Sequence, residues 1–382
     1  MGSSAFHIFW LAGENSGDLH ASLVMKSLNA AIPSLHHSGI GGPRMQREGL
    51  KPLFPFSKFN VMGFAEVLGR LGFFWKVERF LDTFFRDDRP DLAILVDYPG
   101  FNLRIARLAD SHRVPVLYYI CPQFWAWKHN RVFQLRDHVR HVACILPFEP
   151  ELLARHNVAA TYVGHPIAEE ISFELDRDSF ASLYGLDPAK RWIGFLPGSR
   201  DNEISRMLPV YLKAARKLAS QGFELLVSKA LTVSHGLFTS LLENTRTAGL
   251  KVIDGYRYDL MRHADLLVCT SGTATLEAAF IGTPMLICYK TSAFSYAIGR
   301  RLVQIKRVGL PNILLDQNLL PELIQSACTP ENIVRTALSL LSDQDRLQEI
   351  KLELLKIQAS LSEPYPSLEM PRLVKDLLDV HV

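Results

Sequence analysis

Short apolar runs rich in β-branched and aromatic residues alternate with helical patterns along most of the chain. The runs that predict strands span residues 6–11, 92–96, 116–120, 142–146, 192–196, 223–227, 266–269 and 285–288. Strands that alternate with helices are typical of parallel sheets whose two faces are covered by helices. The pattern therefore predicts an α/β protein built from doubly wound units.

The alternation weakens in the middle of the chain. Between residues 164 and 191, the turn Gly164-His165-Pro166 leads into a charged segment that ends in Asp187-Pro188, as expected of a linker between domains. We therefore predict two domains, at 1–170 and 171–341. The active site is expected in a cleft between them, because such sheets bind ligands at the carboxyl ends of their strands.

The last segment of the chain, 342–382, has a helical pattern. Its inward positions recur every three or four residues, as on one face of a helix. These positions are Leu347, Ile350, Leu354 and Ile357. We expect the C-terminal helices to pack across the two domains.

Composition supports this organisation and excludes several classes of protein. A chain of 382 residues with 48% hydrophobic residues is large enough for two packed cores. A net charge of +3 does not indicate a nucleic-acid partner. No apolar run reaches the roughly 18 to 20 residues that span a bilayer. The N-terminus also lacks the regions of a secretory signal, which predicts a cytoplasmic protein.

The cysteines do not have the spacing of a zinc site or of a disulfide framework. We therefore expect free thiols in a reducing compartment and no bound metal. The five cysteines are Cys121, Cys144, Cys269, Cys288 and Cys328.

The predicted strand at 266–269 is followed by small hydroxylic residues and then by a helical pattern. Hydroxyls and free backbone N–H groups at a helix N-terminus favour an anion, because the peptide dipoles are aligned there. The Glu277 carboxylate would lie about one turn behind Thr273 and could accept hydrogen bonds from ribose hydroxyls. The alternative is an ordinary helix start with a solvated Glu277. The candidate phosphate-binding residues are Ser271, Gly272, Thr273 and Thr275.

A βα turn at 11–18 follows the first predicted strand. Such a turn lets a ligand approach the backbone, although this one lacks the GxGxxG dinucleotide fingerprint. We take Gly13, Glu14 and Ser16 as substrate-binding candidates. A second glycine-rich loop, at 39–44, is interpreted as a tight turn.

Asp97 stands at the carboxyl end of the apolar run 92–96. Burying a carboxylate without a partner is costly, so its presence there calls for a reason. Asp97 could be a general base, or it could cap the following helix, a task that Asn102 could equally perform. Its position at the edge of a sheet favours catalysis.

The segment 196–200 also ends a predicted strand and opens a helix. Ser199 and Glu203 do not have capping-box spacing, so capping alone does not explain the segment. Arg200 would present a planar guanidinium, which suits phosphate recognition. The alternative is a surface ion pair with Glu203 or Asp201. Ser199 is a further substrate-binding candidate.

The segment 61–86 is unusually aromatic and is interleaved with basic residues. Such a segment can enter a membrane interface or line an acyl-chain groove. The alternative is a core helix with one solvated face. The residues predicted to contact lipid are Phe73, Phe74, Trp75, Lys76 and Arg79.

Taken in order, these segments resemble the lipid A disaccharide synthase family over nearly the whole chain. The resemblance includes the segments 118–127, 146–149 and 310–313. It implies a GT-B-like fold with two Rossmann-like domains facing across a cleft, the first for the acceptor and its lipid chains, the second for the UDP-sugar. The implied reaction joins UDP-2,3-diacylglucosamine to 2,3-diacylglucosamine 1-phosphate (lipid X). It inverts the anomeric centre and requires neither a metal nor a cofactor.

The resemblance also implies roles for the candidate residues. Asp97 matches the family's proposed catalytic aspartate and Arg200 its essential arginine, whereas Glu277 and Asn312 lie in nucleotide-side motifs. Without a metal, the leaving diphosphate would be stabilised by the helix N-terminus and by Arg200. The segment 61–86 would hold the enzyme at the cytoplasmic face of the inner membrane. Homo-oligomerisation is left open.

The sequence departs from the family pattern at two places, and two other functions are considered as alternatives. Gly100 replaces the second acidic residue of the common Asp-x-Pro-Asp-Phe-Asn motif, which removes a rival for the role of base and strengthens the prediction for Asp97. The segment 121–124 replaces a common Ser-Pro-Ser-Val near the expected acceptor side. The rivals are another GT-B enzyme, such as a UDP-N-acetylglucosamine 2-epimerase, and a non-catalytic nucleotide-sugar-binding protein at the membrane surface.

Overall fold

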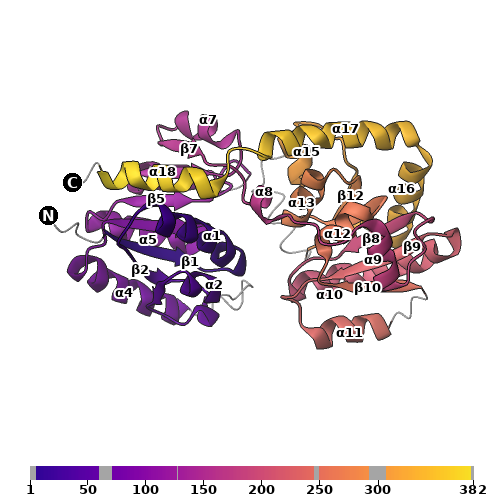
Figure 1. Cartoon of the computed structure of the whole chain (residues 1–382), viewed down its shortest axis with the longest axis horizontal. Coiled ribbons are helices and arrows are strands. Elements are labelled where there is room, and N and C mark those ends of the chain that lie inside the picture. The colour runs from indigo at the N-terminus through magenta and orange to yellow at the C-terminus, as the bar shows by residue number, and fades with distance from the viewer. Residues whose placement is uncertain (1–5, 60–70, 127, 245–248, 292–306, 380–382) are drawn as a thin grey trace. The chain divides into compact units, whose positions relative to one another are not determined.

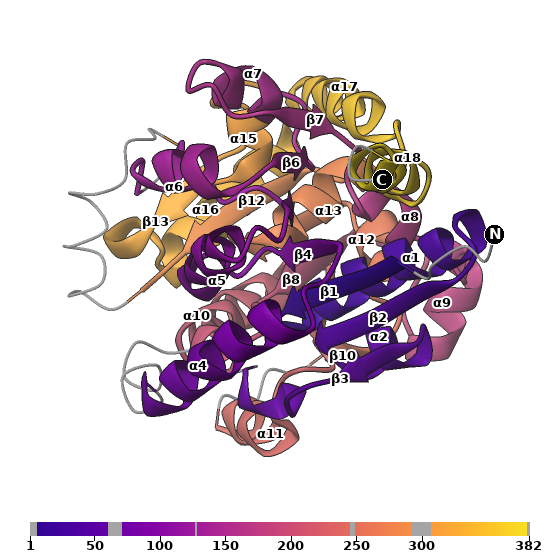
Figure 2. The same cartoon turned by 90° about the vertical axis from the view of Figure 1, so that its left-hand side faces the viewer.

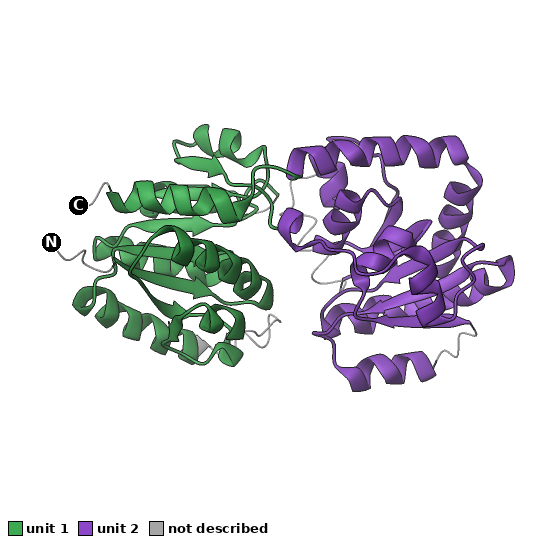
Figure 3. Ribbon diagram, viewed as in Figure 1, with its two compact units in different colours: residues 1–166, 362–382 green, residues 167–361 purple. Residues whose placement is uncertain are grey.

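The computed structural model describes residues 6–59, 71–126, 128–244, 249–291 and 307–379. Part of the predicted lipid-contact segment, 61–70, and Trp127 lie outside these residues. The chain divides into two compact units, unit 1 (Met1–Pro166 and Ser362–Val382) and unit 2 (Ile167–Leu361), shown in Figure 3. Each unit contains its own parallel sheet flanked by helices, so the predicted α/β fold is confirmed (Figure 1).

Unit 1 is built on a seven-stranded parallel sheet in the order β3-β2-β1-β4-β5-β6-β7. Its strands are β1 (Phe6–Ala12), β2 (Leu35–Ile40), β3 (Leu50–Pro52), β4 (Leu92–Val96), β5 (Val116–Tyr119), β6 (His141–Cys144) and β7 (Ala160–Tyr162). Its helices are α1 (Asn15–Ala31), α2 (Pro43–Arg47), α4 (Leu71–Asp87), α5 (Pro99–Ser111), α6 (Arg131–His138), α7 (Glu149–Ala154) and α18 (Pro366–Asp379), with a 3-10 turn η1 (Phe56–Lys58).

The two faces of the unit 1 sheet bury different side chains of the same strands, because successive side chains of a strand point to opposite faces. Phe9 and Leu11 of β1 join a core with α4 and α5. Ile8 and Trp10 join a second core with α1 and α18. Figure 2 shows these two helix pairs on opposite sides of the sheet. Burial on both faces explains why β1 and β4 are almost wholly apolar.

Unit 2 is built on a six-stranded parallel sheet in the order β10-β9-β8-β11-β12-β13. Its strands are β8 (Trp192–Leu196), β9 (Glu224–Lys229), β10 (Leu250–Asp254), β11 (Leu266–Thr270), β12 (Met285–Tyr289) and β13 (Glu322–Ile324). Its helices are α8 (Ile167–Glu170), α9 (Arg177–Tyr184), α10 (Asp201–Leu218), α11 (His235–Glu243), α12 (Arg257–His263), α13 (Thr273–Ile281), α15 (Leu310–Leu314), α16 (Pro330–Ser342) and α17 (Gln344–Leu361), with 3-10 turns η2 (Ala219–Gln221) and η3 (Gln325–Ala327).

The C-terminal segment is shared between the units. The four predicted inward positions of α17 are buried, and α17 packs on α13 and α16 of unit 2. From Ser362 onward the chain belongs to unit 1, where Met370 and Val374 of α18 pack against α1. The first boundary follows Pro166, whereas the sequence placed it at 170. None of the helices in the described part of the chain combines the length and the apolar character that a bilayer crossing requires.

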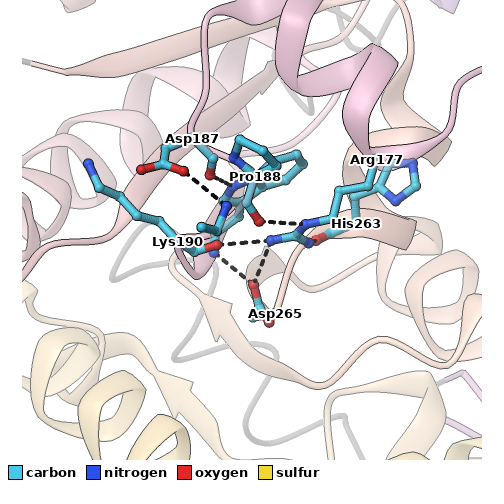
Figure 4. Close-up of polar contacts among 8 residues, drawn as sticks. Arg177, Asp187, Pro188, Lys190, His263 and Asp265 are labelled. Atoms are coloured by element: carbon cyan, nitrogen blue, oxygen red, sulfur yellow. Dashed lines mark hydrogen bonds and ion pairs between the residues drawn. The ribbon is translucent and has the colours of Figure 1, made fainter.

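Arg177, the first residue of α9, connects the start of this helix to the segment before β8 and to the segment before β11 (Figure 4). Its guanidinium donates to the carbonyl oxygens of Pro188, Lys190 and His263 and pairs with Asp265 at 3.5 Å. A hollow of about 450 Å³ opens beside it, lined by residues 173–177, Arg262 and His263. His263 and Asp265 precede β11, so the hollow lies at the amino ends of the strands. Doubly wound sheets bind ligands at the opposite, carboxyl edge.

Candidate functional site

Each sheet has one point at which the strand order reverses. In unit 1 it lies between β1 and β4, and in unit 2 between β8 and β11. Doubly wound sheets bind ligands outside the carboxyl ends of the strands at such a switch point. Ala12 pairs with Val96 across β1 and β4, and Leu196 pairs with Cys269 across β8 and β11. In each unit, the two segments with candidate residues follow neighbouring strands. They therefore begin at the same edge of the sheet, the carboxyl edge.

Asp97 has a strained backbone at the switch point of unit 1. Its φ is +46°, and that of Tyr98 is +48°. The left-handed region costs a non-glycine residue about 1–3 kcal/mol and occurs mainly where surrounding groups enforce it, often at active sites. Here the Tyr118 hydroxyl and the Asn102 side-chain amide both donate to the Asp97 carbonyl oxygen, at 2.6 and 2.8 Å.

The capping alternative does not describe these residues. The N-cap of α5 is Tyr98, which is followed by Pro99, and no described side chain caps the helix. Asn102 lies inside α5, is fully buried, and donates to the carbonyl oxygen of Val96 as well as to that of Asp97. Asn102 therefore holds the end of β4 in place, and Asp97 as a residue is half-buried.

Gly13 and Glu14 lie next to this strained turn. A Cβ atom on Gly13 would lie 2.7 Å from Cδ1 of Tyr98, so only glycine lets the Tyr98 ring occupy its position. Burial, and secondly the charge of Glu14, raise the pKa of Tyr98. Ser16 is exposed in the first turn of α1. Of the three candidates in the βα turn, Gly13 and Glu14 therefore lie next to Tyr98, which follows Asp97.

The loop at 39–44 is a structural turn. The Asp18 carboxylate accepts hydrogen bonds from the backbone N–H groups of Arg44 and Met45, at 3.2 and 3.1 Å. These N–H groups lie in the first turn of α2, where backbone N–H groups have no acceptor within the helix. Asp18 therefore caps α2 from a neighbouring helix, and the loop serves to bring the two together.

Two groups beside Asp97 were not predicted as site residues. The Tyr118 side chain is fully buried, and the charge of Asp97 is one of the influences that raise its pKa, after burial. Arg131 is half-buried at the start of α6, where burial lowers its pKa while the charges of Tyr118 and Asp97 act in the opposite direction. An isolated arginine between predicted elements carries no sequence signal, so only the fold brings Arg131 close to Asp97.

Arg200 is the N-cap residue of α10 and follows the carboxyl end of β8. It forms the ion pair with Glu203 that the sequence offered as an alternative, with Nη1 and Oε1 3.1 Å apart. Glu203 also accepts a hydrogen bond from the backbone N–H of Ser199, at 3.0 Å. The Arg200 side chain remains 51% exposed, so its guanidinium is accessible to an anion at this edge.

The N-terminus of α13 follows the carboxyl end of β11. Gly272 is its N-cap, no described side chain caps the helix, and both Gly272 and Thr273 are exposed. The other two hydroxyls are used within the unit, because Ser271 donates to the Val308 carbonyl and Thr275 to the Gly272 carbonyl. An anion at this helix end would therefore meet backbone N–H groups and the Thr273 hydroxyl.

Glu277 is not solvated at the surface, so the alternative of an ordinary helix start with an exposed Glu277 does not describe it. Its side chain is 6% exposed, and its Oε1 accepts hydrogen bonds from Arg257 at 2.9 Å and from the Tyr258 hydroxyl at 3.4 Å. Burial, and secondly the charge of Glu277, raise the pKa of Tyr258. The carboxylate is thus held in a fixed position by two residues of α12.

Asn312 uses its side-chain amide within unit 2. It donates to the Leu320 carbonyl and to Glu322, and its oxygen accepts from the Leu320 N–H, all at 2.9 Å. Glu322 in turn accepts from the N–H groups of Val308 and Gly309. Asn312 therefore organises the loop beside Ser271, and these contacts account for its burial without a ligand.

The described part of the aromatic segment forms α4, an amphipathic helix. Phe74 lies in the core of unit 1 against Phe59 and Phe101, as the alternative of a core helix expects, and its contact with a membrane or an acyl chain stays a prediction. Phe73 is half-buried. Trp75, by contrast, is 62% exposed and lies beside the Arg79 guanidinium, 5.9 Å from its ring centroid. Lys76 is also exposed.

Structural comparison shows which fold the two units share with known proteins. A putative UDP-N-acetylglucosamine 2-epimerase from Listeria monocytogenes superposes with a TM-score of 0.62 at 11% identity, covering 99% of this chain and 97% of that one. The calicheamicin glycosyltransferase CalG4 also gives 0.62, at 13% identity and 99% coverage of both chains. At such low identity these similarities establish the GT-B-like fold alone.

Sequence comparison identifies the family. A family model described as lipid-A-disaccharide synthetase matches residues 8–367. A lipid-A-disaccharide synthase from Nitrosococcus oceani is 38% identical over 363 residues, or 94% of both chains. One from Trichlorobacter lovleyi is 39% identical over 337 residues, or 88% of both. Because these matches extend over nearly the whole length, the chain belongs to the lipid-A-disaccharide synthase family.

Proposed function

We propose that this chain transfers a diacylglucosamine unit from UDP-2,3-diacylglucosamine to the 6-hydroxyl of lipid X. The products are a β(1→6)-linked tetra-acyl disaccharide 1-phosphate, an intermediate of lipid A biosynthesis, and UDP. Family membership supports the reaction class. The observation that carries the assignment of residues is the strained Asp97 at the switch point of unit 1.

Asp97 is the proposed general base. It takes the proton of the acceptor 6-hydroxyl while that oxygen attacks the anomeric carbon of the donor. The bond between the anomeric carbon and the diphosphate oxygen breaks at the same time, and its electron pair leaves with UDP. Attack opposite the leaving group inverts the anomeric centre. The hydrogen bonds from Tyr118 and Asn102 support this role, because they fix the backbone from which the carboxylate projects.

The leaving diphosphate is the proposed ligand of unit 2. Negative charge develops on it as the bond breaks, and preorganised donors and dipoles stabilise such charge. The exposed N-terminus of α13 and the Arg200 guanidinium both follow strands at the switch point of this unit. Arg200 would exchange its ion pair with Glu203 for a bidentate contact with phosphate, which is the stronger interaction.

Glu277 is the proposed ribose acceptor. Its carboxylate is buried and held by Arg257, so it can accept hydrogen bonds from ribose hydroxyls without first being ordered. We assign no ligand contact to Asn312, because its amide is occupied within the unit.

The outer face of α4 is the proposed membrane contact, at the cytoplasmic face of the inner membrane. An exposed indole next to cationic side chains suits the interface of an anionic bilayer. Trp75, Lys76 and Arg79 provide that combination.

Release of UDP tests the reaction. Purified protein is mixed with UDP-2,3-diacylglucosamine and lipid X in detergent, with a chelator present and with UDP-N-acetylglucosamine as the control donor. We expect UDP and the disaccharide phosphate only when both lipids are present. Conversion of the control donor alone would instead support an epimerase, and the absence of turnover with any donor would support a binding protein.

Asp97→Asn tests the base. Asp91 stands at the other end of β4, is exposed, and makes a comparable control because it too is an aspartate flanking this strand. We expect Asp97→Asn to lower kcat by roughly 10²- to 10⁴-fold, the usual contribution of a general base, while Asp91→Asn retains turnover. Unchanged kcat in Asp97→Asn would contradict the assignment.

A further inference from the structure

Unit 1 contains a buried cluster of two thiols and one carboxylate. The Sγ atoms of Cys121 and Cys144 and a carboxylate oxygen of Glu149 all lie within 4.8 Å of one another. The three residues come from different elements, namely the segment after β5, the last residue of β6 and the first residue of α7. Each is at most 4% exposed. The proposed transfer reaction uses none of these side chains.

We propose that this cluster binds a soft divalent cation, with Zn²⁺ as the ion. Zinc–sulfur and zinc–oxygen bonds of about 2.3 and 2.1 Å place the ligand atoms of a tetrahedral site about 3.6 to 3.8 Å apart. The cluster therefore needs adjustments of about 1 Å or less to close around zinc. Both thiols would bind as thiolates, with their protons released to solvent.

The surroundings of Glu149 already resemble the outer shell of a metal site. Its Oε1 accepts from the Trp125 indole N–H at 3.3 Å, and its Oε2 accepts from the Leu146 N–H at 3.2 Å. Hydrogen bonds of this kind fix the orientation of a ligating carboxylate. The Ile145 backbone donates a third hydrogen bond to this carboxylate, so one of its roughly four acceptor positions remains for a cation.

The ligand set selects among cations. Magnesium and calcium take oxygen ligands only, whereas thiolates favour zinc and other soft ions. Three protein ligands leave a fourth position for water, as in zinc sites with three protein ligands. The segment that carries Cys121 has no regular secondary structure from 120 to 126.

Unit 2 provides a matched control within the same chain. Cys288 and Cys328 are also buried and close enough for their thiols to interact. Among the residues that the structure describes, no third candidate ligand joins this second pair. Packing of two thiols alone is ordinary core behaviour, so the two pairs differ in the carboxylate.

The test is zinc content together with cobalt spectroscopy of the full chain. Wild type, Cys121→Ser, Cys144→Ser and Cys288→Ser are reduced, incubated with Zn²⁺ and dialysed, and bound metal is counted. A parallel titration with Co²⁺ follows the thiolate-to-cobalt charge-transfer band. We expect one zinc per chain and the band in wild type and Cys288→Ser, and their loss in Cys121→Ser and Cys144→Ser.

Two results would overturn the proposal. One is wild type that holds no more zinc than Cys121→Ser, and the other is a Cys121–Cys144 disulfide that forms in place of metal binding. A second measurement covers variants that fail to fold. The rate at which Cys121 and Cys144 of the native wild type react with a thiol reagent, mapped by mass spectrometry, should fall with Zn²⁺ and recover with a chelator. Rates independent of Zn²⁺ would also refute the site.

Discussion

Protonation of His37 should destabilise unit 1 below neutral pH. His37 lies in β2 and is 3% exposed. Its Nδ1 accepts a hydrogen bond from the Trp10 indole N–H at 3.0 Å, so the ring proton is on Nε2, which donates to Asn29 at 2.9 Å. A second proton on Nδ1 would face the Trp10 N–H. Burial, and secondly the charges of His36 and His7, lower the pKa of His37 from 6.5 to about 4.

The sign and size of the effect follow from linkage. The unfolded chain binds the proton more tightly than the folded chain, so stability is fully present above pH 6.5 and is lost as the pH falls towards 4. At about pH 5 the two pKa values give a loss of about 2 kcal/mol, and the full difference amounts to about 3.4 kcal/mol below pH 4.

Urea unfolding of wild type and His37→Gln at about pH 7.5 and about pH 5 measures this loss. The pKa values of His141 and His165 are also lowered, but their contributions cancel when the two proteins are compared. The charge of His7 acts on His37, so its titration contributes to the measured difference. We expect wild type to lose about 2 kcal/mol more than His37→Gln between the two pH values. Equal losses, or an NMR titration of His37 with its midpoint near 6.5, would refute the argument.

Three further predictions concern the proposed site and the membrane. Tyr118→Phe removes one of the two hydrogen bonds to the carbonyl oxygen of Asp97, the proposed base. We expect kcat to fall with little change in KM, and stability to fall by about 0.5–1.5 kcal/mol; a change in KM alone would contradict this. Trp75→Ser should weaken sedimentation with anionic vesicles, whereas Phe133→Ser, which removes an exposed aromatic beside an arginine elsewhere in unit 1, should not; equal effects would refute the α4 surface. Arg257→Gln should reduce the preference for UDP over 2′-deoxy-UDP in calorimetry, because it loosens Glu277, and an unchanged ratio would exclude that role.

The sequence predicts the central strands well and the outer ones poorly. All eight predicted strands are present, with ends that shift by at most two residues. The strands that were not predicted are β2, β3, β7, β10 and β13, and all but β2 lie at the edge of a sheet. An edge strand such as β7 is short and only partly buried, so it lacks the continuous apolar run that marks a strand covered on both faces. In β2, His36, His37 and Ser38 interrupt the run.

The positions of the candidate residues follow from the sequence more readily than their partners. Asp97 is recognisable because it comes directly after the apolar strand β4, and Arg200 because it ends the short turn that follows the apolar strand β8. Arg257 and Glu277 are separated in the sequence, and no local pattern in either segment predicts the ion pair that holds the Glu277 carboxylate. The same holds for the cluster of Cys121 with Glu149, whose members come from different elements. Long-range partners depend on the order of strands in the sheet, which the local pattern does not encode.

The energetics of the Asp97 turn give the strongest reason to regard it as functional. Two consecutive non-glycine residues in the left-handed region cost about 2–6 kcal/mol together. The two hydrogen bonds to the Asp97 carbonyl contribute about 1–3 kcal/mol. The difference must be supplied by the packing of unit 1, including the Tyr98 ring against Gly13. A glycine at position 97 would relieve part of this strain, but it would also remove the carboxylate that the proposed reaction uses as its base.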